Sequence, residues 1–427
     1  MKRAPRAPKR RPPKTPSRLG VVRGSALYVG ALIGPGLLLV PALGVQAAGP
    51  ASVLAWAGLL VLSAPLAATF AALAVRFPVA RGVSAYVEAG FGHAASAVTG
   101  AWFVAAVVLG APAVAIIGGY YVADLTGSGG GIAVVAALLM FGVVLITNAL
   151  GLRLSSTVQL GLSSLLVAVL AVSIAVALPV KGGDNWTPFA PHGWWAIGTA
   201  ANILVWQFVG WEAVAQLAGE FRRPQVDLPR AMTVAFAAVT VLYMSLAVVT
   251  VGVSATSHSR VPLADLVSVG FGHSGRTATA LLAVALTMGT MNVYMGGTAK
   301  LARELALGGA LPRWLAGRER SVPWRPLVLF GATGLPLLAA LALGLLSATD
   351  LVRATSSLFI GVYVLSIASA VRILEGRSRL VAIAAVAMVV LIAAFSGWYA
   401  LVPAVVAGLA LIQWRLHERG ARSSASA

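Results

Sequence analysis

The sequence contains no cysteine and few acidic residues. With no thiol in 427 residues, disulfide bonds, thiol catalysis and cysteine-held iron–sulfur clusters are excluded. Only 12 residues are Asp or Glu against 31 Lys and Arg, and charged residues make up 10% of the chain. Soluble domains carry about 25% charged residues, so the shortage of charge excludes a soluble globular chain.

Motifs that carry catalysis or hold metals are also missing. The five histidines lie near the ends of predicted segments or in connections, without a helical pairing for a metal ion. They are His93, His192, His258, His273 and His417. No nucleotide-binding loop and no nucleophile–base pair is present. We therefore expect no cofactor, no metal site and no catalytic residue, and a membrane enzyme or sensor is disfavoured.

Apolar sequence, in contrast, is abundant. Hydrophobic residues make up 59% of the chain and the mean hydropathy is +0.91. About 20 apolar residues cross about 30 Å of hydrocarbon as a helix. Stretches of that length are Gly24–Gln46, Ala51–Val75, Ala94–Tyr121, Ile132–Ala149, Ser155–Val180, Trp194–Gly219, Ala231–Ser254, Thr277–Leu301, Pro326–Leu346 and Leu351–Ile373. An all-α polytopic membrane protein is predicted.

One further apolar tract, Leu380–Trp414, is interrupted at Ser396-Gly397 and is too long for one ordinary span. Basic residues precede and follow it, and they prefer the cytoplasmic side, so we interpret it as two short spans. Twelve spans then leave few basic residues outside, namely Lys181, Arg260, Arg276 and Arg353. The net charge of +19 is thus explained by topology. Both termini are predicted to be cytoplasmic, and no nucleic-acid partner is needed.

The predicted spans divide the chain into parts. Residues 1–22, basic and rich in proline, are expected to be a disordered cytoplasmic tail. Residues 23–374 form a core of two five-span repeats, about 23–180 and 194–374. Because five is odd, the second repeat enters the membrane from the opposite side, so the repeats are inverted. Two additional peripheral helices follow over 375–415, and then a cytoplasmic tail over 416–427.

Two helix breaks are predicted at one depth, in spans one and six. Gly34–Gly36 follows Arg23 by about 11–13 residues and Glu212 precedes Arg222 by ten, which places both about 15–20 Å from the inner face. The glycines weaken a helix and Pro35 cannot donate a backbone hydrogen bond. Gly-Pro-Gly alone fits a simple kink equally well. Paired breaks in inverted halves, however, indicate a transport site near the membrane midplane.

Glu212 is the one acid predicted deep within a span. An ionisable group at that depth costs about 2.5–3.5 kcal/mol on insertion scales and is normally kept for function. Burial disfavours the ionised carboxylate, and no histidine or lysine is placed to carry a proton through the core. Glu212 is therefore predicted to be the proton-coupling group. The alternative is that its carboxylate only caps the broken helix.

Three stretches resemble a known family. They are GALIGPGLLLVPAL in the first span, RFPVARGVSAYVEAGFG after the second, and FVGWEAVAQLAGEFRRPQVDLPRAM across the sixth. They are similar to the amino acid–polyamine–organocation superfamily of permeases, and within it to bacterial exporters of L-methionine and branched-chain amino acids. The similarity covers about Gly24 to Trp414, and Pro35 and Arg81 depart from the usual pattern.

The resemblance implies the inverted-repeat fold of amino acid carriers, with helices one and six broken. The residues agree with it, because amides near Gly36 and Leu37 suit a carboxylate and freed carbonyls of the sixth span suit an ammonium group. Phe208 and Trp211 offer apolar walls. Asn292, in the eighth span, could instead tie helices together. The candidate substrate-binding residues are Ile33, Gly34, Pro35, Gly36, Leu37, Phe208, Val209, Gly210, Trp211 and Asn292.

We expect a secondary active transporter of small neutral apolar amino acids (methionine, leucine, isoleucine, valine) in the cytoplasmic membrane. Export in exchange for protons is the predicted mode, and an importer or exchanger of the same superfamily is the alternative. The expected partners are amino acid, protons and lipid bilayer, and the protein is expected to be a monomer or dimer. Tyr120 and Tyr121 are expected in the interfacial aromatic belt, with a gate role as the alternative.

Overall fold

The computed structural model describes residues 19–77, 82–152, 156–180, 182–213, 221–253, 259–317 and 322–425. All regular secondary structure within these ranges is helical. The main helices are α1 (Val21–Leu32), α2 (Val40–Ala48), α3 (Ser52–Arg76), α4 (Val83–Phe91), α5 (His93–Leu125), α6 (Gly130–Ala149), α7 (Ser156–Ala177), α8 (Ala196–Leu204), α10 (Pro224–Gly252), α11 (Pro262–Leu307), α12 (Trp324–Ala342), α13 (Ala348–Ile373), α14 (Gly376–Ala393) and α15 (Leu401–Ala425).

Nine stretches of the described chain are long and apolar enough to cross a membrane, and Val21–Leu32 and Ala196–Phe208 are shorter apolar helices. Two of the nine are interrupted by a glycine with a positive φ. The interruption is at Gly49 (φ 61°) in Val40–Arg76 and at Gly397 (φ 58°) in Gly376–Arg419, where only glycine adopts the backbone without strain. The prediction of an all-helical polytopic fold is confirmed, while the twelve spans and the inverted repeats stay predictions.

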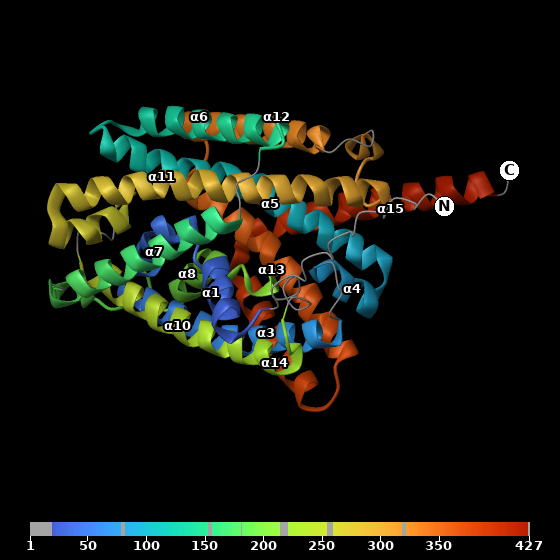
Figure 1. Cartoon of the computed structure of the whole chain (residues 1–427), viewed down its shortest axis with the longest axis horizontal. Coiled ribbons are helices and arrows are strands. Elements are labelled where there is room, and N and C mark those ends of the chain that lie inside the picture. Colours follow the sequence, from blue (N-terminus) through green and yellow to red (C-terminus); the bar gives the residue numbers. More distant parts are fainter. Residues whose placement is uncertain are drawn as a thin grey trace, which may run out of the picture.

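The long helices form a buried centre and an apolar periphery. Helices α5 and α13 are the most buried of the candidate spans, and α14 and α15 the least. Figure 1 shows α5 and α11 running through the middle of the molecule, with α6 and α12 side by side along one edge. Leucines such as Leu139, Leu343 and Leu391 are exposed on that periphery. Continuous exposed apolar surface of this kind suits lipid.

Close contacts between helix backbones depend on small residues. A Cβ added at Gly119 of α5 would lie 2.0 Å from the carbonyl oxygen of Ala133 in α6. Any larger residue at position 119 would therefore push α6 away from α5.

At the start of α13, Ser347 and Asp350 form a capping box, in which each side chain accepts from the other residue's backbone N–H.

The long helices begin and end at two opposite ends of the molecule, which are called the α4 end and the elbow end below. The α4 end holds the starts of α1 and α10, where Leu19 pairs with Phe221, and the end of α13, where Arg372 donates to Gly90. The elbow end is named for Gly272, whose φ of 56° and ψ of −142° bend α11. Arg260 and Arg276 flank the first turns of α11 at the elbow end, and Arg353 lies in the first turns of α13. The α4 end holds Arg23 at the start of α1, Arg222 and Arg223 before α10, and Arg372 at the end of α13.

The two predicted tails are only partly described. Most of 1–22 lies outside the described residues, but α1 already begins at Val21 and Leu19 is buried. At the other terminus, helix α15 continues through Arg415 to Ala425. The helix thus continues past residue 415, while the division into two additional helices over 375–415 and a tail over 416–427 stays a prediction.

Candidate functional site

The first break separates α1 from α2. Helix α1 ends at Leu32, Ile33 and Gly34 are extended, and a short helix η1 (Pro35–Leu38) precedes α2. Pro35 explains this local structure, because its ring disfavours helical backbone at Gly34 and it lacks an N–H. The break lies where the sequence predicted it.

The second break follows α8. A short helix η5 (Val205–Phe208) ends in extended backbone at Val209, and a second short helix, η6 (Trp211–Ala213), follows. Between them Gly210 has a φ of 137°, and a Cβ there would lie 2.8 Å from the carbonyl oxygen of Ala31 in α1. Glycine is required both for the backbone angle and for this close approach. The two breaks therefore lie against each other.

A cavity of about 640 Å³ opens beside the two breaks. Its lining comes from both breaks and from α4, α5, α7, α11 and α13. Of the predicted site residues it includes Ile33, Gly34, Pro35, Gly36, Val209, Gly210 and Glu212. Apolar walls come from Phe103, Trp206 and Phe359. Such a site, mostly apolar with a few polar groups, suits a small amphiphilic molecule.

Two tyrosines fix the backbone of the breaks. The Tyr243 hydroxyl of α10 lies 2.9 Å from the carbonyl oxygen of Leu32 and 3.0 Å from that of Gln207, and it can donate to either. The Tyr363 hydroxyl of α13 lies 3.1 Å from the carbonyl oxygen of Phe208. Carbonyls released by a broken helix need partners inside a membrane, and the single proton of the Tyr243 hydroxyl provides one for either of the two carbonyls that it reaches.

Glu212 is buried at the edge of the cavity, 9% exposed. Its Oε2 accepts hydrogen bonds from the backbone N–H of Gly210 at 2.9 Å and from the Tyr363 hydroxyl at 2.6 Å. Within the described residues no Lys or Arg forms an ion pair with it. The carboxylate thus caps the break and also faces a space that water or substrate can enter. Both roles considered from the sequence fit this geometry.

Four predicted site residues lie outside the cavity lining. Leu37 is buried away from it. The Phe208 ring packs edge-on against Tyr243, with centroids 5.5 Å apart, and Trp211 packs beside Phe236. Asn292 donates to Thr147 Oγ1 and to the carbonyl oxygen of Leu152. For Asn292 the structure supports the alternative, a tie between α11 and the α6 end.

The elbow end of the cavity is closed. The Tyr121 hydroxyl donates to the carbonyl oxygen of Leu38 at 2.8 Å, and it lies next to Leu263 in the first turn of α11. The expectation of a belt position for Tyr121 is wrong, because its side chain is fully buried. It finds its hydrogen-bond partner in the protein instead of at the interface.

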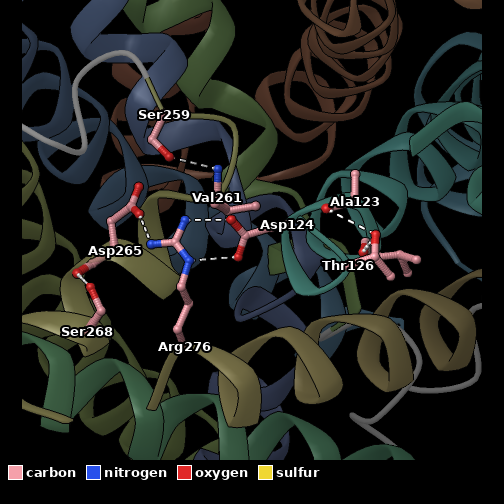
Figure 2. Close-up of polar contacts among 9 residues, drawn as sticks. Ala123, Asp124, Thr126, Ser259, Val261, Asp265, Ser268 and Arg276 are labelled. Carbon is pink, nitrogen blue, oxygen red and sulfur yellow. Dashed lines mark hydrogen bonds and ion pairs between the residues drawn. The ribbon is translucent and has the colours of Figure 1, made fainter. Parts of the chain in front are cut away.

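An ion-pair cluster at the elbow end reinforces this closure (Figure 2). Arg276, just after the Gly272 bend, donates to both carboxylate oxygens of Asp124 at the end of α5, at 2.5 and 2.9 Å. A third nitrogen donates to Asp265 in the first turn of α11 at 2.6 Å. Bidentate charged pairs are strong and directional, so the cluster holds the first turns of α11 on the end of α5.

The α4 end of the cavity carries polar and charged lining residues. Ser84 lines it from α4, and Lys300 and Glu304 from the last turns of α11. In the described part of the chain, neither Lys300 nor Glu304 has an ion-pair partner. The cavity therefore extends from the breaks toward the α4 end.

Comparison with known proteins agrees with this architecture. Residues 19–414 match the family model described as amino acid permease. The chain belongs to the amino acid permease family. It is 33% identical over 393 residues to the uncharacterized amino acid permease YecA of Bacillus subtilis, covering 90% of this chain and 92% of YecA.

Two further relatives carry substrate names. The permease is 28% identical over 404 residues to the L-methionine/branched-chain amino acid exporter YjeH of Escherichia coli, covering 92% of this chain and 95% of YjeH. It is also 28% identical over 258 residues to the branched-chain amino acid permease BcaP of Bacillus subtilis, covering 55% and 54%. The predicted superfamily membership is confirmed.

Sequence reasoning missed several polar residues of this permease's cavity. Gln207, Gln159, Thr290 and Thr355 line it, and Tyr363 supports it from behind. Glutamine and threonine within apolar spans give a weak signal, because they recur in ordinary helix packing. Gln207 could have been found by its position three residues before Gly210, inside the predicted break.

Proposed function

We propose that the permease is a secondary active transporter that exports small neutral apolar amino acids in exchange for protons. Methionine, leucine, isoleucine and valine are the proposed substrates. The observation that carries the proposal is the meeting of two helix breaks and one buried carboxylate at a single cavity. Paired breaks of this kind hold the polar ends of a zwitterion with backbone groups. The similarity to YjeH, an L-methionine/branched-chain amino acid exporter, supports the substrate class and the direction.

The walls of the cavity argue for apolar substrates. Phe103, Trp206 and Phe359 surround the space beside the breaks, and the charged residues Lys300 and Glu304 line only its α4 end. A charged side chain of a substrate would be buried without a partner, at a penalty of several kcal/mol. We further propose that the α4 end, where Arg23, Arg222, Arg223 and Arg372 lie, faces the cytoplasm. The structure then represents an inward-facing state.

Counterflow in proteoliposomes tests the substrate class. Unlabelled leucine or methionine inside should drive uptake of labelled methionine, whereas equimolar lysine or glutamate should neither drive nor inhibit it. Strong inhibition by lysine or glutamate would contradict the proposal. An imposed pH gradient tests direction: in antiport, methionine moves against the proton flux, and in symport, as in an importer, it moves with the proton flux.

Glu212 is proposed as the proton-coupling group. The Glu212→Gln variant keeps an acceptor for the Gly210 N–H but cannot titrate. It should retain counterflow and lose pH-driven accumulation of methionine. Tyr363→Phe is the matched control, because it removes one hydrogen bond to Glu212 and leaves the carboxyl group. Uphill transport by the Gln variant at the normal rate, with an unchanged pH profile, would leave only the capping role.

A further inference from the structure

The side-chain carboxamide of Gln207 is buried, and its N–H donor has no hydrogen-bond acceptor among the described residues. The side chain is 2% exposed and lines the cavity. Its Nε2 has no hydrogen-bond partner among the described residues. Buried polar groups are nearly always hydrogen-bonded, and an exception needs an explanation. Nε2 is covered against Gly36 in this conformation, but it belongs to a side chain that lines the cavity, so a molecule that enters becomes its partner when the carboxamide turns toward it.

The carboxamide of Gln207 reaches from the second break to the first. A Cβ added at Gly36 would lie 2.5 Å from Nε2 and 3.0 Å from Oε1 of Gln207. The absence of a side chain at position 36 therefore creates the space that the carboxamide occupies. Gly36 does not have a positive φ, so the backbone angle alone does not demand glycine there.

The backbone of Gln207 is held in place. Its carbonyl oxygen lies 3.0 Å from the Tyr243 hydroxyl, which is also 2.9 Å from the carbonyl oxygen of Leu32 at the end of α1. The carboxamide is thus presented by a fixed backbone, next to both breaks. Fixed donors bind a ligand with little further loss of conformational freedom.

Other neutral donors of the cavity are less suitable. Gln159 Nε2 already donates to Thr290 Oγ1 at 3.3 Å. Thr355 also has an unpartnered hydroxyl and lies beside Gly110 of α5, but a hydroxyl can accept as well as donate. A carboxylate accepts hydrogen bonds only, so an N–H donor suits it. An ammonium group instead requires acceptors, which Glu212 and the carbonyls of the second break offer.

We propose that Gln207 is a substrate-binding residue, whose Nε2–H donates a hydrogen bond to the carboxylate of the amino acid held between the two breaks. The proposal rests on the proposed function, because it assigns one end of that substrate. Gln207 then distinguishes amino acids from amines that lack the carboxylate. Gly36 contributes by leaving room for the carboxamide.

The test compares two probes in the purified full-length protein. They are L-methionine and 3-methylthiopropylamine, which is methionine without its carboxylate. Calorimetry gives the dissociation constant of each probe. The dissociation constant of the amine divided by that of methionine measures how strongly the carboxylate is recognised. Gln207→Leu should lower this ratio about 10- to 100-fold, the range for one hydrogen bond to a charged group. Gln207→Glu should lower it further, since two carboxylates would then face each other.

A matched control is Asn202→Leu. Asn202 is a buried amide on the same span, but its Nδ2 donates to Ser396 Oγ at 3.0 Å and it does not line the cavity. The ratio should be unchanged in this variant. A ratio within about twofold of the unsubstituted protein in both Gln207 variants would overturn the inference. If the unsubstituted protein binds neither methionine nor leucine, the proposed function itself fails.

A second variant tests the same contact from the Gly36 side. Gly36→Ala leaves Gln207 intact but displaces its carboxamide, so it should also lower the ratio. In a Gln207→Ala background the same change should lower the ratio little further, because no carboxamide remains to be displaced. Equal, additive losses in the two backgrounds would show that Gly36 acts independently of Gln207, and the proposed contact would be wrong.

Discussion

The two ends of the cavity satisfy their charged groups differently. At the elbow end, Arg276 is 32% exposed and binds two carboxylates that are more buried than itself. At the α4 end, the pair of Arg223 and Asp227 has an arginine that is 73% exposed, and Lys300 and Glu304 line the cavity. Exposed pairs are worth about 0–1 kcal/mol, while shielded bidentate pairs are stronger. The comparison indicates that ion pairs close one end and leave the other accessible.

The largest effect is expected from the removal of Arg276, which should open the elbow end. Arg276→Met leaves Asp124 and Asp265 facing each other without a cation. We expect the elbow-end closure to weaken by about 2–3 kcal/mol, below the 3–5 of a fully buried pair because Arg276 is partly exposed. The chain has no cysteine, so Val114→Cys in the cavity lining reports access cleanly. An impermeant maleimide applied from the elbow side should label it more than tenfold faster.

The control for Arg276 is Arg260→Met at the same end. The Arg260 guanidinium lies over the Tyr120 ring, 5.2 Å from its centroid, outside the cluster. Labelling of the Val114→Cys protein should stay slow in this variant. If Arg276→Met also labels slowly, the cluster does not hold the elbow end closed.

A smaller change at the elbow end sharpens the comparison. Tyr121→Phe removes the hydroxyl that donates to the carbonyl oxygen of Leu38 and keeps the ring. One neutral hydrogen bond contributes about 1 kcal/mol, so maleimide labelling should rise about fivefold. A rise as large as that of Arg276→Met would mean that this hydroxyl, and not the ion pairs, dominates the closure.

The smallest effect is expected at the α4 end. Arg223→Met removes the exposed partner of Asp227 and should change the free energy of unfolding by less than about 1 kcal/mol. Thermal unfolding in detergent measures it, and labelling from the elbow side should not change. An opening of the elbow end by Arg223→Met would show that the two ends do not differ as described.

Local rules of sequence predicted the helices and their breaks. Pro35 disrupts a helix wherever it stands, and Gly210 allows a backbone that other residues avoid. The turn at Gly397 within the last apolar tract follows the same logic, combined with the length of a span. Such features depend on a few neighbouring residues, so they can be read without knowing the tertiary structure.

Side-chain directions around the breaks could not be predicted in the same way. At a break the regular rotation of side chains around the helix axis is lost. The spacing of residues in the sequence therefore no longer predicts which side chain faces the cavity. Phe208 and Trp211 turn toward Tyr243 and Phe236, while Trp206 and Gln207 line the cavity. Likewise, Asn292 is directed by partners near the α6 end, far away in sequence. These choices depend on contacts between distant segments.

The hydroxyls of Tyr243 and Tyr363 contact the second break from two different helices. Tyr243 on α10 reaches the carbonyl oxygen of Gln207, and Tyr363 on α13 reaches that of the next residue, Phe208, together with Glu212. A tilt of α10 relative to α13 cannot keep both attachments at their present lengths. A tilt of one helix against the other would therefore displace Gln207 relative to Glu212.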